Sequence, residues 1–198
     1  MAPVDKFITY TETMREVTHI PIRHLDRDSV NPIQDLRLLL ELMRLYKKHK
    51  PDLILHYTVK PNIYGGLAAR LLGIPSVGVI TGLGYSLMHE GWINVITRLL
   101  YKFFLPFHRK VIFENTDDKA LFEKAGLVSA SKSVAIKGCG VDTTYYSPNG
   151  VVRSLEIITF TFIGRLLYDK GVREFIEAAQ MVKKQNKQVQ FWLIGDLD

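Results

Sequence analysis

Residues 51–84, PDLILHYTVKPNIYGGLAARLLGIPSVGVITGLG, alternate short apolar runs with a helical pattern of small residues. We predict a strand over 52–57, a short helix over 66–73 that ends at Gly73, and a strand over 76–80. Several of the expected strands in the chain are apolar on both faces, as parallel strands are when helices cover both sides of a sheet.

The same alternation continues on both sides of this stretch. Further strands are expected over residues 17–24, 111–115 and 133–138. One helix should begin at Asn31-Pro32 and run to about Lys48, and another should be capped by Thr116 and stop at Gly126. The pattern predicts a Rossmann-like α/β domain with a parallel sheet over residues 1–150.

A Pro/Gly/polar stretch, DTTYYSPNGVVRS (142–154), predicts a linker. The cycle then restarts with a strand over 157–164, a helix over 172–185 and a strand over 189–195. A single strand–helix–strand unit does not complete a doubly wound sheet. We therefore expect residues 151–198 to be the truncated start of a second α/β domain.

Composition narrows the class of protein. The formal charge of +6 and pI of about 9.3 suggest an anionic partner, although a modest positive charge can also have no specific meaning. The absence of zinc-finger spacing, RNP-like aromatics and a long Lys/Arg block argues against nucleic acid. One cysteine, Cys139, permits no disulfide framework, and no signal peptide is visible, so a cytoplasmic protein is expected.

Polar and glycine residues follow the ends of the expected strands, where ligands of open parallel sheets bind. These positions are His56–Lys60, Thr81–Tyr85, Glu114-Asn115, Gly138–Gly140, Gly164-Arg165 and Gly195-Asp196. They predict a binding crevice, although loops between strands and helices are polar and glycine-rich in any case. Leu87 stands where G-x-G-x-x-G would have its third glycine, and no P-loop motif is present, which disfavours NAD and ATP sites.

The segment GRLLYDKG (164–171) places Arg165 after a strand and Lys170 before a helix. Two cations next to free helix amides can bind a diphosphate. If a sugar left UDP at such a site, these cations would stabilise the charge that grows on the β-phosphate. The residues alone, without a resemblance to a known family, favour two solvated loop charges.

The segment WINVITRLLYKFFLPFHRK (92–110) is basic, aromatic and free of acids. Such a helix can lie in the interface of an anionic membrane. The membrane-facing residues would be Trp92, Arg98, Lys102, Phe103 and Phe104. The alternative is a buried helix that packs on the sheet and ends at Pro106.

His56, at the end of an expected strand, could contact a sugar or be a structural core residue.

Taken together, the segments resemble family 4 glycosyltransferases of the GT-B fold. More narrowly, they are similar to bacterial enzymes that extend polyprenyl-diphosphate-linked sugars. The resemblance is carried by HYTVKPNIYGGLAARLLGIP (56–75), TGLGYS (81–86), VIFENTDDKALF (111–122), GCGVDTTYYSP (138–148) and FIGRLLYDKGVREFIEAA (162–179).

The resemblance implies a retaining hexosyl transfer from a nucleotide sugar, commonly UDP-linked, without a metal or other cofactor. The acceptor would be a lipid-linked saccharide of surface polysaccharide biosynthesis, such as capsule or exopolysaccharide, at the inner face of the plasma membrane. The implied donor-binding residues are Gly164, Arg165, Lys170 and Gly171, with Arg165 and Lys170 catalytic. The implied acceptor-binding residues are His56, Lys60, Thr81, Gly82, Gly84 and Tyr85.

Two departures from the family pattern leave alternatives open. We expect the family's first strand and glycine loop to precede Met1, and its E-x(7)-E segment is not present up to Asp198. A second hypothesis is therefore a non-catalytic fragment that binds acceptor or membrane. A third is another Rossmann-like enzyme, such as a nucleotide-sugar epimerase or dehydrogenase, which the missing G-x-G-x-x-G disfavours.

Overall fold

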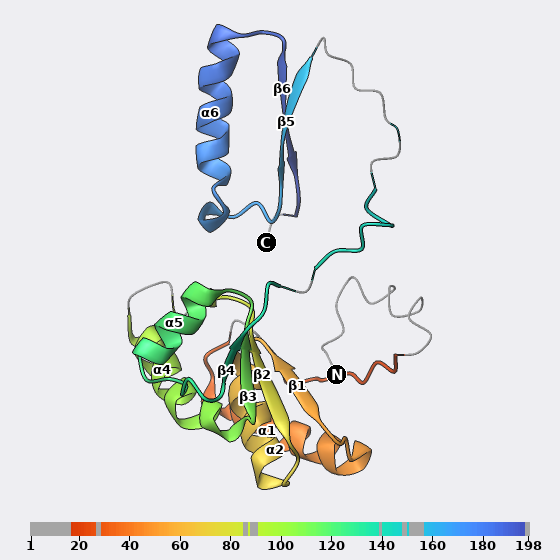
Figure 1. The fold of residues 1–198 in the computed structure, drawn as a ribbon, viewed down its shortest axis with the longest axis vertical. Coiled ribbons are helices and arrows are strands. Elements are labelled where there is room, and N and C mark those ends of the chain that lie inside the picture. Colours follow the sequence, from red (N-terminus) through yellow and green to blue (C-terminus); the bar gives the residue numbers. More distant parts are fainter. Residues whose placement is uncertain are drawn as a thin grey trace. The chain divides into compact units, whose positions relative to one another are not determined.

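The computed structural model describes residues 17–26, 29–84, 87, 91–138, 140–147, 150 and 157–196. The chain divides into two compact units, Met1–Val141 and Asp142–Asp198 (Figure 1). The division falls at the start of the segment that the sequence predicts as a linker. We refer to the two parts as the first unit and the second unit.

The first unit is built on a parallel sheet of four strands in the order β1-β2-β3-β4. The strands are β1 (Ile54–Tyr57), β2 (Ser76–Ile80), β3 (Lys110–Phe113) and β4 (Ser133–Ala135). The register pairs His56 of β1 with Gly78 of β2, and Gly78 with Val111 of β3. Four of the five strands expected in this part of the chain are thus confirmed, with β1, β3 and β4 shorter than predicted.

Helices precede and connect these strands. The α-helices are α1 (Pro32–His49), α2 (Gly66–Leu71), α4 (Trp92–Phe104) and α5 (Thr116–Lys124). A π-helical turn, η2 (Pro61–Gly65), leads into α2, and a 3₁₀ turn, η3 (Leu105–Phe107), follows α4. Asn31 caps α1 as predicted, because its side-chain oxygen accepts a 2.9 Å hydrogen bond from the Ile33 amide.

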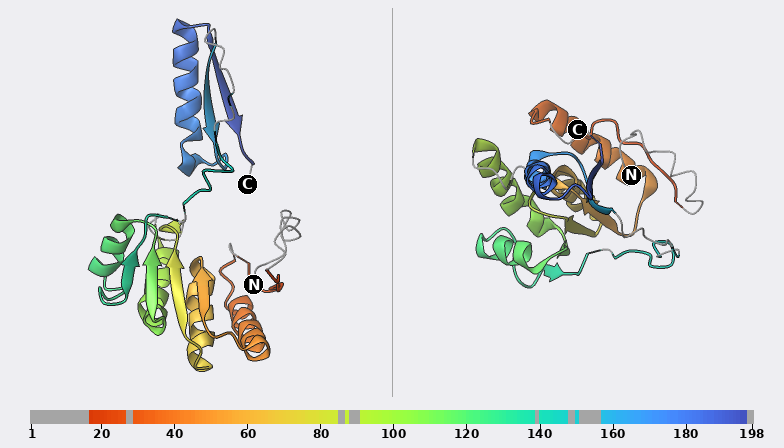
Figure 2. Two further views of the ribbon diagram at one scale, coloured as in Figure 1. Left: turned by 45° about the vertical axis from the view of Figure 1, so that its right-hand side comes forward. Right: turned by 90° about the horizontal axis from the view of Figure 1, so that it is seen from above.

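The described helices cover one face of the sheet, which the two views of Figure 2 also show. Val111 and Phe113 of β3 are fully buried on that face. On the opposite face, Leu55 and Tyr57 of β1 are about half exposed, at 50% and 52%. The expected cover on both faces is therefore not found among the described residues. Successive strands added in one direction through right-handed crossovers place their helices on the same side.

Two local predictions were wrong. Residues 17–24 form no continuous strand, because Pro21 has no N–H and the amides of Arg23 and His24 each donate a 2.9 Å hydrogen bond to the Glu41 carboxylate of α1. Asn115, and not Thr116, caps α5, since its side-chain oxygen accepts from the Asp118 amide at 2.7 Å.

The core of the first unit has two parts. One is the contact of α4 and α5 with β2 and β3, where the Tyr101 and Phe122 rings lie 5.5 Å apart and Phe122 also meets Phe113. The other joins α1 to α2 through Leu38, Leu42, Tyr46, Ala68 and Ala69. Fully burying one such large apolar side chain contributes about 1.5–3 kcal/mol.

The second unit is a parallel strand pair with one helix. β5 (Ile158–Ile163) pairs with β6 (Val189–Ile194) along their full length, and α6 (Val172–Gln185) connects them. Phe175 of α6 contacts Phe162 and Phe191 at 5.7 and 5.8 Å between ring centroids, which fixes the helix on one face. The expected strand–helix–strand pattern is confirmed over these residues.

Candidate functional site

The backbone after β1 departs from regular geometry at the edge where ligands of parallel sheets bind. Thr58 has a φ of 69°, which is rare for a β-branched residue, and the π-helical turn Pro61–Gly65 follows directly. The buried Asn62 amide group holds the loop, since its nitrogen donates to the carbonyls of Thr58 at 2.8 Å and Val79 at 2.9 Å. The first predicted acceptor loop is therefore tightly constrained.

His56 lies beneath this edge and not on its surface. Its side chain is 3% exposed, and its Nε2 forms a 2.8 Å hydrogen bond with the Tyr46 hydroxyl. The ring also lies 5.3 Å from that of His108, whose nitrogens bond the Ser76 hydroxyl and the Asn62 carbonyl, each at 2.9 Å. Burial contradicts the expected contact of the His56 side chain with an acceptor, and the alternative of a structural histidine holds.

Three glycines make room for these two buried rings. A Cβ on Gly65 would lie 2.5 Å from the His56 ring, and one on Gly66 would lie 2.8 Å from the His108 ring. A Cβ on Gly78 would meet Asn62 at 2.8 Å and His108 at 3.1 Å. The glycine pair in HYTVKPNIYGG is thus explained by packing around imidazoles.

Burial also sets the protonation state of the pair. Desolvation, helped by the neighbouring His108, lowers the pKa of His56 from 6.5 to about 3. Desolvation lowers the pKa of His108 as well, against the opposing effect of its bond to the Asn62 carbonyl. Both rings are neutral at pH 7, which suits a structural role.

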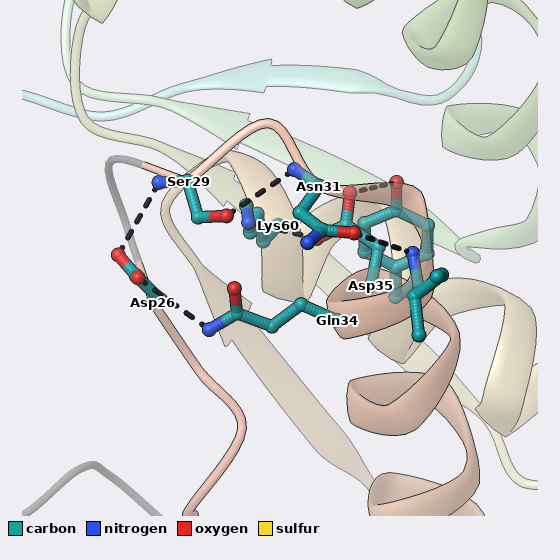
Figure 3. A network of polar contacts seen from close by, with 8 residues as sticks. Asp26, Ser29, Asn31, Gln34, Asp35 and Lys60 are labelled. Carbon is teal, nitrogen blue, oxygen red and sulfur yellow. Dashed lines mark hydrogen bonds and ion pairs between the residues drawn. The ribbon is translucent and has the colours of Figure 1, made fainter.

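Lys60 is likewise part of the structure of the loop. Its ammonium nitrogen lies 2.7 Å from Asp35 Oδ1, with the two side chains only 12% and 14% exposed, and the atom itself is buried (Figure 3). The Tyr64 hydroxyl donates to Asp35 Oδ2 at 2.8 Å. Asp35 thus pairs with the Lys60 charge inside the protein, and contact of Lys60 with an acceptor stays a prediction.

The same network fixes the approach to α1. Asp26 accepts from the Ser29 amide at 3.2 Å, and the Ser29 hydroxyl accepts from the Asn31 amide at 3.2 Å (Figure 3). These bonds place Asn31 at the helix start, four residues before Asp35. Asp35 could be recognised in the sequence as an acid in the first turn of a capped helix. Its pairing with Lys60, 25 positions later, could not be predicted.

Thr81, Gly82 and Gly84 remain at the carboxyl end of β2 as candidates for substrate contact. All three are exposed, and the φ angles of Gly82 and Gly84, 145° and 64°, suit glycine. Tyr85 lies outside the described residues. Contact of this loop with an acceptor stays a prediction.

α4 carries an exposed apolar stripe on the side away from the core. Its members are Trp92, Val95, Ile96, Leu99 and Phe103, with Trp92 62% and Phe103 66% exposed. Arg98 and Lys102 are exposed beside it. Phe104 is an exception to the predicted membrane-facing set, because it is half-buried against the core and contacts Phe107. Each residue advances the helix by about 100°, so Phe104 points away from the stripe.

In the second unit, Gly164 and Arg165 follow β5, and Lys170 precedes Gly171, the N-cap residue of α6. Arg165 and Lys170 are both exposed, and no side chain caps the first amides of α6. Gly171 has a φ of 81°, and a Cβ on Gly195 would lie 1.8 Å from the Gly164 carbonyl oxygen. Glycine at position 195 therefore lets the end of β6 approach the end of β5 closely, and Gly171 adopts the left-handed conformation of the turn before α6.

Two further features concern the described residues alone. They contain no group of three or more His, Cys, Asp or Glu side chains that could hold a metal ion. None of their helices has the length and apolar character needed to cross a bilayer.

The sequence matches a known family over more than half of its length. Residues 10–115 fit the family described as glycosyl transferase 4-like, and the chain belongs to that family. The parallel sheet of the first unit is what the sequence resemblance predicted for it.

Two curated relatives are 27% identical to the chain. One is the N,N'-diacetylbacillosaminyl-diphospho-undecaprenol alpha-1,3-N-acetylgalactosaminyltransferase of Campylobacter jejuni, matched over 96% of this chain and 54% of its own length. The other is the UDP-Gal:alpha-D-GlcNAc-diphosphoundecaprenol alpha-1,3-galactosyltransferase of Escherichia coli, matched over 85% of this chain and 46% of its own length. The chain spans about half the length of both relatives.

A solved structure with the same fold is HepE of Anabaena in complex with UDP and glucose. It superposes with a TM-score of 0.68 and 22% identity, over 94% of this chain and 51% of that one. At this identity the likeness shows the fold, and it confirms the expected α/β class of the GT-B type.

The buried histidines predict a stability that falls in mild acid. The unfolded chain binds protons below pH 6.5 whereas folded His56 does not bind them until about pH 3, so stability is present above pH 6.5 and is lost as pH falls. For His56 alone the free energy of unfolding should drop by about 2 kcal/mol between pH 7.5 and pH 5. Urea denaturation followed by far-UV circular dichroism measures it.

His56→Gln should flatten this pH dependence, and His49→Gln, at an exposed histidine of α1, is the matched substitution for comparison. A free energy of unfolding that is constant from pH 7.5 to pH 5 in the wild type contradicts a buried neutral pair.

The ion pair of Lys60 and Asp35 predicts a strong dependence on both partners. Asp35→Asn leaves a buried ammonium without its counter-charge and should lower the free energy of unfolding by about 3 kcal/mol. The double variant Asp35→Asn/Lys60→Met should regain at least half of that loss. Breaking the exposed pair of Arg173 and Glu177 with Glu177→Gln should cost less than about 1 kcal/mol. If the double variant loses as much free energy of unfolding as the Asp35→Asn and Lys60→Met variants lose together, the two side chains do not interact.

Proposed function

We propose that this protein takes part in the transfer of a hexosyl residue from a UDP-sugar to a polyprenyl-diphosphate-linked saccharide. The observation that carries the proposal is the turn Gly164–Gly171, where two exposed cations stand beside an uncapped helix start in a member of a glycosyltransferase family. Membership of this family favours glycosyl transfer over the third hypothesis, an epimerase or dehydrogenase.

The donor chemistry follows from the charges of this turn. In the transfer, the bond between the anomeric carbon and the β-phosphate oxygen breaks, and a bond to an acceptor hydroxyl oxygen forms. The hydroxyl proton is released with UDP. Arg165 and Lys170 stabilise the negative charge that gathers on the departing diphosphate, helped by the first amides of α6.

The acceptor and the stereochemistry are proposed from the relatives. Both are named for undecaprenol-diphosphate-linked acceptors and for alpha-1,3 linkages. Alpha-linked products support transfer with retention of configuration. Surface polysaccharide or glycan assembly is the biosynthetic setting that this acceptor class supports.

The stripe on α4 gives such an enzyme a way to meet its acceptor. An acid-free helix with five exposed apolar side chains and flanking cations suits the interface of an anionic bilayer. We assign the stripe Trp92, Val95, Ile96, Leu99 and Phe103 to the inner face of the plasma membrane, where the protein is peripheral.

The donor assignment predicts a large effect from one charge. Arg165→Ala and Lys170→Ala should each reduce transfer from UDP-galactose or UDP-N-acetylgalactosamine to undecaprenyl-diphospho-N-acetylglucosamine by roughly 10²-fold. The control is Lys184→Ala, which removes an exposed cation in the last turn of α6. Product is measured by radiolabel transfer, and UDP binding by calorimetry.

Two outcomes count against the donor assignment or the function. Wild-type rates in the Arg165 and Lys170 variants would remove these residues from the site. No transfer with any UDP-sugar, together with retained vesicle binding, would favour the hypothesis of a non-catalytic binding protein.

The membrane assignment separates two neighbouring phenylalanines. Phe103→Ser should weaken co-sedimentation with vesicles that contain phosphatidylglycerol, because a 66% exposed side chain of the stripe is lost, and the melting temperature should stay unchanged. Phe104→Ser should instead lower the melting temperature, since that ring packs on the core. Unfolding of the Phe103 variant, or its normal vesicle binding, would show that the stripe is not a membrane surface.

A further inference from the structure

A shallow groove of about 440 Å³ lies between α4 and α5 in the first unit. Its lining residues are Arg98, Ala120, Leu121, Lys124 and Ala125. The volume falls within the range of about 300–1,000 Å³ that is common for small-molecule sites. Of the candidate site residues named from the sequence, Arg98 alone is among the described residues that line it.

The floor of the groove is apolar and stably placed. Small side chains, Ala120 and Ala125, leave the space open, and Leu121 is 42% exposed along it. Beneath, the ring contact of Tyr101 with Phe122 at 5.5 Å ties α4 to α5. The spacing between the helices is therefore set by the core and does not require a ligand.

Two cations, Arg98 from α4 and Lys124 from α5, are the ionisable groups among the described residues that line the groove. Among the residues that the structure describes, none forms an ion pair with either of them. The acids of α5 are engaged or placed elsewhere, since Glu123 pairs with Lys119 at 2.9 Å and Asp118 binds Asn115 at 2.9 Å. The groove thus offers positive charge above an apolar floor.

Arg98 also connects the groove to the exposed stripe. On a helical projection, Arg98 and Lys102 lie between the stripe and the core-facing side chain of Tyr101, with Val95 one turn before Arg98. An occupant with its charge at Arg98 could therefore continue along apolar surface from the groove to the bilayer.

We propose that this groove binds the phosphate end and first isoprene units of the polyprenyl carrier to which the acceptor saccharide is attached. The charge complementarity and the continuity with the stripe both fit an anion joined directly to a long hydrocarbon chain. The proposal rests on the proposed function, and it moves recognition of the lipid from the loop after β1 to α4 and α5.

The test compares two vesicle types of equal charge. One contains undecaprenyl phosphate in phosphatidylcholine, and the other contains phosphatidylglycerol in the same carrier lipid. The wild type should bind the first several-fold more tightly. Lys124→Gln should reduce that preference severalfold, because a cation that lines the groove and would contact the bound phosphate is lost. Lys48→Gln removes the same charge from an exposed position in the last turn of α1, outside the groove, and should retain the preference.

A second variant tests the apolar floor while both cations remain. Ala120→Phe, at an exposed position of α5, should fill the groove and abolish the preference without lowering the melting temperature. Equal binding of the wild type to both vesicle types would overturn the proposal, as would an unchanged preference in both groove variants.

Failure of this proposal and failure of the proposed function give different results. Transfer to an acceptor with a short, water-soluble alkyl chain that is as efficient as transfer to the polyprenyl acceptor overturns the groove and leaves the transferase in place. A preference for polyprenyl phosphate that depends on Lys124, without transfer from any UDP-sugar, supports the groove and overturns the transferase.

Discussion

Two imidazole rings buried under the carboxyl edge of the sheet constrain the rest of the first unit. His56 and His108 occupy the space between β1, β2 and the helix after β1, and they leave no room for a Cβ at Gly65, Gly66 or Gly78. Asn62 closes the same space by binding the carbonyls of Thr58 and Val79. The positive φ of Thr58 and the π-helical turn follow as the backbone conformations that accommodate this packing. The segment HYTVKPNIYGG is thereby part of the core, and the exposed surfaces for binding lie around it.

Those surroundings offer separate surfaces for separate chemistry. The first unit presents apolar side chains and cations on α4 and α5, which suit a lipid with a phosphate. The second unit presents Arg165 and Lys170 around the start of α6, which suit a nucleotide diphosphate. In the proposed function these two features serve one activity, because glycosyl transfer to a lipid-linked saccharide needs both an anionic donor and an amphipathic acceptor.

The periodic parts of the sequence predicted the fold well. Apolar runs located β2, β5, β6 and α6 almost to the residue, and Asn31-Pro32 located the start of α1, because local caps and patterns decide these elements. Differences arose where distant groups compete. Residues 17–24 have a strand-like pattern, but Glu41 takes their amides. His56 and Lys60 stand at a strand end as binding residues do, but Tyr46 and Asp35, from a helix earlier in the chain, bury them. The sequence shows that a polar residue follows a strand. It does not show which distant side chain forms a hydrogen bond or ion pair with that residue.

The division of labour between the two units is tested most directly by hydrogen–deuterium exchange with mass spectrometry, on the protein with UDP and then with undecaprenyl phosphate in detergent micelles. UDP should protect the peptides that cover residues 164–175 and leave 92–104 and 116–125 unchanged. Undecaprenyl phosphate should protect 92–104 and 116–125 and leave 164–175 unchanged, while the buried segment 61–71 exchanges slowly in every state. Protection of 92–104 by UDP, or of 164–175 by undecaprenyl phosphate, would contradict separate donor and acceptor surfaces.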